Sequence, residues 1–155
     1  MSSLAFAPVE PSDRIPPTDD GQFVTFSCGS VHYGVPVLAV REIRSWQPTT
    51  VIPGRAVAAR GVLDMRGTVV EVFDLAVLLG GTPIEPTSGS VVLVLALADR
   101  VVGVLVDAVS DIIEVRVGDR MPLPPQDETS GGQVSFMASY EDRLIAILAL
   151  STFFD

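Results

Sequence analysis

The amino-acid sequence predicts an all-β fold in which two small β-barrels pack together. Three observations favour this fold class. Short apolar runs are separated by Gly, Pro and Asp, which is the pattern of strands and turns. The runs fall into two sets of about five, divided by a Pro-rich connector at residues 82–89. Barrels suit such short strands because a closed sheet leaves no exposed edge.

The connector also sets the expected domain organisation. Residues 1–21 combine four prolines with four acidic residues, and such a segment buries too little apolar surface to offset the entropy of ordering it. We therefore expect a disordered leader at 1–21 and one folded domain at 22–155. Within that domain the first barrel is expected at about 22–88 and the second at about 89–155.

The first elements after the leader read as a β-hairpin. Residues 23–27 and 31–35 are apolar segments that flank a turn at Gly29. A further extended segment, 37–43, follows and is expected to end before Pro48.

Residues 61–75 form the most informative stretch of the chain. Strands are predicted at 61–65 and 68–73, joined by a tight turn at Arg66 and Gly67. Glycine after Arg66 allows the positive φ that such a turn needs, which fixes the direction of the arginine side chain.

A short helical turn is expected next. Asp74 is placed to act as the N-cap of a helix at 75–79, because its side chain can accept a hydrogen bond from the first turn. Gly80 and Gly81 are typical of a helix end.

The second half repeats the strand pattern. Residues 91–97 and 101–106 predict a hairpin whose continuous apolar runs indicate burial on both faces. The alternation at 113–117 predicts a half-exposed strand, and 144–150 a last apolar strand. A Pro- and Gly-rich loop lies between these two, and 151–154 is expected to form a short terminal turn.

Charge and length exclude several classes of protein. The chain has a net charge of −9, with ten arginines and no lysine, which disfavours a nucleic-acid backbone and an anionic membrane surface. The longest apolar run, 91–98, is too short for a membrane helix, which needs ~20 residues. Cys28 is the sole cysteine, so no internal disulfide can form and a reducing cytoplasm is the natural setting.

The sequence holds little catalytic apparatus. His32, the sole histidine, lies in an apolar strand, and one His with one Cys cannot build a zinc site of the usual type. Cys28 has no neighbouring base in the sequence. Asp107 and Asp111 on one strand would lie roughly 13 Å apart, too far for a glycosidase pair. We therefore expect no catalysis, no cofactor and no metal, and a protein that binds other proteins.

Three motifs together resemble one known family. The run Val40-Arg41-Glu42-Ile43, the stretch 61–75 with its Arg-Gly turn and Asp-Leu pair, and the strand 103–111 are similar to those of the CheW family. These bacterial adaptors couple chemoreceptors to the histidine kinase CheA. The resemblance covers residues 22–155 and implies two SH3-like five-stranded barrels, with a receptor groove between them and a separate surface for the kinase's regulatory domain.

The resemblance also implies site residues and a setting. Its motif places the family's glutamate at Glu42 and its turn arginine at Arg66, which we expect to interact as an ion pair at an interface. The protein-binding positions that it implies are Val37, Val40, Glu42, Gly61, Arg66, Gly67, Val91, Val102 and Ile112. The expected localisation is cytoplasmic, with recruitment to receptor arrays at the inner membrane.

Two alternatives stay open from the sequence. A scaffold of the same fold could serve a surface-motility or second-messenger kinase pathway instead. An oligonucleotide-binding barrel would need a basic groove with stacking aromatics, whereas the chain is acidic and only 6% aromatic.

Overall fold

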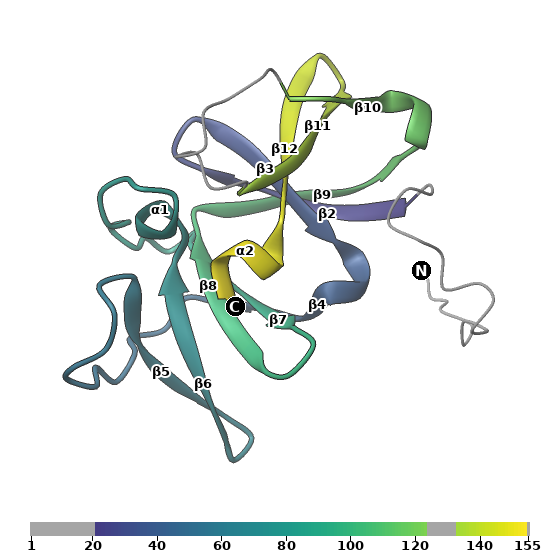
Figure 1. Ribbon diagram of the computed structural model, residues 1–155. Coiled ribbons are helices and arrows are strands. Elements are labelled where there is room, and N and C mark those ends of the chain that lie inside the picture. The colour runs from purple at the N-terminus through teal and green to yellow at the C-terminus, as the bar shows by residue number, and fades with distance from the viewer. Residues whose placement is uncertain (1–20, 124–132, 155) are drawn as a thin grey trace.

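The computed structural model describes residues 21–123 and 133–154 and arranges them as two β-sheets with a few short helices (Figure 1). The all-β prediction is confirmed. The expected leader lies outside the described residues, except for Gly21, which begins the first strand. Within the described residues, no helix has the length and hydropathy that a membrane crossing requires.

One sheet has six strands in the order β10-β11-β12-β3-β2-β9. All its neighbours are antiparallel except β12 and β3, which run parallel. A 3-10 turn, η3 (Val117–Asp119), links β9 to the two-residue strand β10. The strands are β2 (Gly21–Cys28), β3 (Val31–Pro36), β9 (Ala108–Val115), β10 (Arg120–Met121), β11 (Val134–Tyr140) and β12 (Arg143–Leu148).

The other sheet has five strands in the order β4-β7-β8-β6-β5, again with a single parallel pair, β6 with β8. Three short helices flank it: η2 (Val37–Ala39), α1 (Leu75–Leu78) and α2 (Leu150–Phe154). The strands are β4 (Val40–Ser45), β5 (Ala59–Met65), β6 (Thr68–Asp74), β7 (Val91–Ala96) and β8 (Val101–Val106).

The sheets do not follow the expected division of the chain at residues 88 and 89. The five-stranded sheet takes β7 and β8 from beyond the connector, and the six-stranded sheet takes β2 and β3 from before it. Figure 1 shows the purple strand β2 beside the green strand β9. This placement buries both faces of β2, because Phe23 enters one buried cluster while Val24 and Phe26 enter another.

Three buried clusters hold the sheets together. One lies inside each barrel, and the third, which we call the central cluster, joins them; it includes Val24 and Phe26 of β2 and Leu93 and Leu95 of β7. Side chains of β7 alternate between two of these clusters. Val92 and Val94 belong to the cluster of the five-stranded barrel, whereas Leu93 and Leu95 belong to the central cluster. The prediction that 91–97 is buried on both faces is therefore confirmed.

Most local predictions agree with the structure. Both predicted hairpins of the five-stranded sheet form, and the Asp74 carboxylate accepts a hydrogen bond from Val77 N at 3.3 Å at the start of α1. The strand expected at 113–117 begins earlier, at Ala108, and ends at Val115. Strand β11 was not expected, because its burial does not follow a simple alternation.

Candidate protein-binding site

A β-bulge in β4 determines which side chains share a face. Val40 is paired with Leu95 of β7, but Glu42 is already paired with the next residue, Val94, so Arg41 is the extra residue of the bulge. Ile43 continues the pairing opposite Leu93. Paired residues of neighbouring strands lie on the same face of a sheet.

The bulge therefore separates apolar from charged side chains. Val40 and Ile43 lie on the face of the central cluster, to which their β7 partners belong. Glu42 and Arg44 lie on the opposite face, whose β7 residues point into the five-stranded barrel. Without the bulge, Val40 and Ile43 would point to opposite faces.

Ile112 of β9 extends the apolar side of this arrangement. It is paired with Val24, another member of the central cluster, so it flanks the same cluster from the six-stranded sheet. Ile43 and Ile112 are 45% and 55% exposed, and Val37 and Val40 are half-buried against the cluster. We call Val37, Val40, Ile43 and Ile112 the apolar strip.

Two expected apolar positions are placed differently. Val102 is 1% exposed and belongs to the central cluster, because β8 is an inner strand of its sheet, so it has no surface to offer a partner. Val91 is half-buried against the same cluster at the start of β7. Ile43, which the sequence interpretation left out of the site, is more accessible than either.

The expected ion pair is present. Arg66 Nη2 donates to Glu42 Oε1 at 2.7 Å, and Arg44 Nε lies 3.9 Å from the other oxygen, Oε2. The Arg66 side chain is 77% exposed and that of Glu42 is 25% exposed. A pair this exposed contributes only about 0–1 kcal/mol to stability. Its effect is geometric, since it ties the edge strand β4 to the β5–β6 turn.

The expected tight turn at Arg66 and Gly67 is present, and it has type I′ character. Arg66 has a φ of +56° and Gly67 a φ of +88°, and positive φ at both central residues defines this turn. A non-glycine residue in this left-handed region costs about 1–2 kcal/mol. Asp64 Oδ1 accepts a hydrogen bond from Gly67 N at 2.9 Å, which stabilises the turn.

Gly61, by contrast, has a structural role. Its φ is +134°, and a Cβ there would lie 2.5 Å from the carbonyl oxygen of Thr50. Thr50 exchanges two backbone hydrogen bonds with Val62, of 3.0 and 2.8 Å, which join the segment after β4 to β5 and close the barrel. The missing side chain of Gly61 permits this closure, and the residue is buried.

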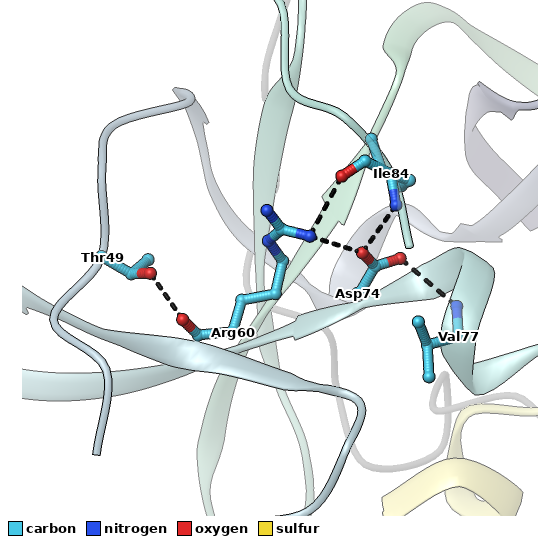
Figure 2. A network of polar contacts seen from close by, with 5 residues as sticks. All are labelled: Thr49, Arg60, Asp74, Val77 and Ile84. Carbon is cyan, nitrogen blue, oxygen red and sulfur yellow. Dashed lines mark hydrogen bonds and ion pairs between the residues drawn. The ribbon is translucent and has the colours of Figure 1, made fainter. Parts of the chain in front are cut away.

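An ion pair with a buried carboxylate, Arg60–Asp74, was missed by the sequence interpretation (Figure 2). Arg60 Nη1 donates to Asp74 Oδ2 at 2.8 Å and to the Ile84 carbonyl at 3.0 Å, while Ile84 N donates to Asp74 Oδ2 at 2.9 Å. Asp74 is 1% exposed. The network joins β5, the start of α1 and the connector, and the Arg60 guanidinium also lies over the Trp46 ring, 5.3 Å from its centroid.

The residues considered for catalysis lie elsewhere. Cys28 is buried at the end of β2, and its burial, with the carboxylates of Asp107 and Asp74 nearby, raises the pKa of the thiol to about 11. The thiol therefore stays protonated at neutral pH and is a poor nucleophile. Asp107 Oδ2 accepts a hydrogen bond from Gly29 N at 2.7 Å, which anchors the β2–β3 turn.

Comparison with known proteins identifies the family. The family model for the CheW-like domain matches residues 22–155. The chain is 38% identical to the chemotaxis protein CheW of Rhizobium meliloti (strain 1021) over 136 residues, which cover 86% of each chain. It is 35% identical to a probable chemotaxis protein CheW of Rhizobium etli over 138 residues, covering 87% of this chain and 88% of the relative.

A solved structure agrees. The crystal structure of the scaffolding protein TtCheW from Thermoanaerobacter tengcongensis superimposes with a TM-score of 0.79 at 25% identity, covering 87% of this chain and 92% of that one. The expected pair of SH3-like barrels is thereby confirmed.

The fold and these matches together define the class of protein, the signalling adaptors of bacterial chemotaxis. Within that class the chain belongs to the CheW family. CheW is the scaffold that couples receptors to CheA in chemotaxis.

Proposed function

We propose that this chain couples the cytoplasmic tip of a chemoreceptor to the regulatory domain of a CheA-type histidine kinase through two separate surfaces. It acts without catalysis, in the cytoplasm, at receptor arrays of the inner membrane. The observation that supports the receptor surface is the division of β4, with the apolar strip on one face and the Glu42–Arg66 pair on the other.

The apolar strip suits an amphipathic helix. A helix can place apolar side chains at spacings of three and four residues against exposed aliphatic groups such as Ile43 and Ile112. In water these side chains are partly exposed, so a partner that covers them gains about 25 cal/mol for each Å² of apolar surface removed from solvent.

The ion pair lies on the other face of β4, but β4 is an edge strand of its sheet, so a partner along this edge can reach both faces. The ion pair then adds orientation to the apolar contact. Arg66 donates to Glu42 through Nη2, and its side chain is mostly in solvent, where the planar guanidinium can bind a partner carboxylate. Weak individual contacts suffice in an array, because many tethered copies raise the effective concentration of each partner.

The proposal assigns the expected positions to different roles. The receptor is proposed to contact the apolar side chains of Val37, Val40, Ile43, Val91 and Ile112. The ion pair of Glu42 and Arg66 is proposed to orient the receptor. Gly67 acts through the turn that holds Arg66. Gly61 and Val102 act through the fold, because both are buried.

We expect the Arg66→Glu variant to keep the far-UV circular dichroism spectrum of the parent protein and to lose receptor-dependent activation of the kinase. The substitution places two carboxylates where one ion pair stood, at a side chain that is mostly in solvent. Phosphate incorporation into the kinase, measured with receptor-containing membranes, reports the loss.

Arg143→Glu is the matched control, because it makes the same charge change at an exposed position at the start of β12. The control is expected to activate the kinase normally. Normal activation by Arg66→Glu would remove Arg66 from the receptor surface and with it the proposed role of the ion pair.

A further inference from the structure

We propose that Asp64 is a positioning residue of the receptor surface, which acts by holding the turn that presents Arg66. The expected effect of Asp64 on receptor binding rests on the proposed function. The claim that Asp64 holds the turn depends only on the structure of the turn. Its basis is the hydrogen bond from Gly67 N to Asp64 Oδ1, of 2.9 Å.

The exposure of Asp64 argues against a role in packing. Asp64 lies on the solvent side of β5 between the buried side chains of Leu63 and Met65. Its cross-strand partner, Val69, is 66% exposed. A side chain in this position contributes to the structure mainly through the groups that it binds.

The turn needs such support because of the residue at its tip. Arg66 occupies a left-handed position that Gly, Asn and Asp adopt more readily. Asp64 compensates by accepting a hydrogen bond from the amide of Gly67, which lies beyond the last pair of the strand ladder, Met65 and Thr68.

The effect on Arg66 passes through the backbone. Among the described residues, the ion pairs of Arg66 and Glu42 involve no contact with Asp64. The direction of a side chain depends on the backbone φ and ψ of its own residue. If the turn changes type, the Arg66 guanidinium leaves the position in which it reaches Glu42 Oε1 at 2.7 Å.

The conservative variant separates this role from a charge effect. Asp64→Asn keeps a side-chain oxygen that can accept from Gly67 N, whereas Asp64→Ala removes the acceptor. We expect Asp64→Ala to weaken binding of a receptor cytoplasmic fragment about five- to ten-fold, the size of one lost hydrogen bond. Asp64→Asn is expected to restore most of the affinity, and Asp99→Ala, in the β7–β8 turn, to leave it unchanged.

A double-mutant cycle tests the route through Arg66. In an Arg66→Ala background, Asp64→Ala is expected to cause no further loss of affinity, because its only effect is on the position of the missing side chain. Amide and arginine Nε relaxation, measured by NMR on the free protein, is expected to show greater mobility of Gly67 and Arg66 in Asp64→Ala.

Three results would overturn the inference: equal losses from Asp64→Ala in both backgrounds, no rescue by Asp64→Asn, or unchanged NMR order at Arg66. These differ from a failure of the proposed function. If Arg66→Ala alone left receptor affinity intact, the receptor surface would be wrong, and the NMR comparison would still decide whether Asp64 holds the turn.

Discussion

At the scale of single residues, the two ion pairs of the five-stranded barrel have opposite tasks. In the Arg60–Asp74 pair the carboxylate is buried, with a side chain 1% exposed, and further hydrogen bonds with Ile84 help to fix the relative position of β5, α1 and the connector. The Glu42–Arg66 pair is exposed and adds little to stability, but it presents charged groups at a surface. Burial, and not residue type, distinguishes structure from recognition here.

The buried pair gives the first stability prediction. Arg60→Met keeps an apolar side chain of similar length but leaves the carboxylate of Asp74, which is 1% exposed, without its cation. Breaking a buried pair in this way costs about 3 kcal/mol. Urea unfolding followed by circular dichroism measures the difference.

Arg55→Met serves as the matched control, because Arg55 and Glu71 form an exposed pair with an N–O distance of 3.8 Å. Its cost is expected to stay below about 1 kcal/mol. Equal losses for the two variants would show that the Arg60–Asp74 pair carries no special weight.

The roles of these ion-pair residues differed in how far the sequence could predict them. Asp74 was recognisable as an N-cap because the signal is local: an Asp before a short apolar helix that ends at two glycines. Its partner Arg60 was not, because a bulge between Ala59 and Gly61 sets the direction of that side chain. The pair Glu42–Arg66 was expected only through the family's motifs, since 24 positions separate the two residues.

At the scale of elements, bulges and tight turns decide what each strand presents. The bulge at Arg41 turns Val40 and Ile43 to one face, which no count of alternating residues predicts. The position of the turn, by contrast, could be predicted from the sequence. The Arg66-Gly67 turn forms where expected, and both residues have positive φ. Three hairpins were therefore predicted correctly, whereas the β11–β12 hairpin and the faces of the edge strand β4 were not predicted.

Closure of the five-stranded barrel gives a prediction at this scale. Gly61→Ala would place a Cβ 2.5 Å from the Thr50 carbonyl oxygen at a φ of +134°, so β5 and the segment after β4 must separate. We expect a loss of about 2 kcal/mol or more in the free energy of unfolding. Thermal or urea unfolding measures it.

Gly118→Ala is the control for this substitution, because a Cβ there has no heavy atom within 4 Å. It is expected to change stability by less than about 1 kcal/mol. A Gly61→Ala variant as stable as this control would mean that the barrel does not depend on close approach at Gly61.

At the scale of the whole molecule, the two barrels are interleaved along the chain. The all-β class was predicted correctly, but one sheet has six strands where five were expected. The assignment of strands to sheets was also wrong, because the parallel pairs β12–β3 and β6–β8 join segments far apart in sequence. Short-range patterns carry no information about such pairings. The interleaving also makes the central cluster common to both sheets, so the apolar strip borders a core that both barrels share.

We interpret the apolar strip as a binding surface that is formed before the partner binds. The strip draws on η2, on β4 of the five-stranded sheet and on β9 of the six-stranded sheet. Val37 and Val40 pack against the central cluster, and the strand partners of Ile43 and Ile112 belong to it. A partner helix bound there contacts a surface that is formed before binding, which limits the entropy lost on association.

The most direct test of the account is calorimetric titration of the full chain with a receptor cytoplasmic fragment and, separately, with the regulatory domain of a CheA-type kinase. The account predicts measurable affinity for each, and an Ile43→Asp substitution in the apolar strip that weakens the receptor titration while the kinase titration is unchanged. Absence of binding to both proteins would contradict the adaptor function proposed for this chain, and equal weakening of both titrations would contradict two separate surfaces.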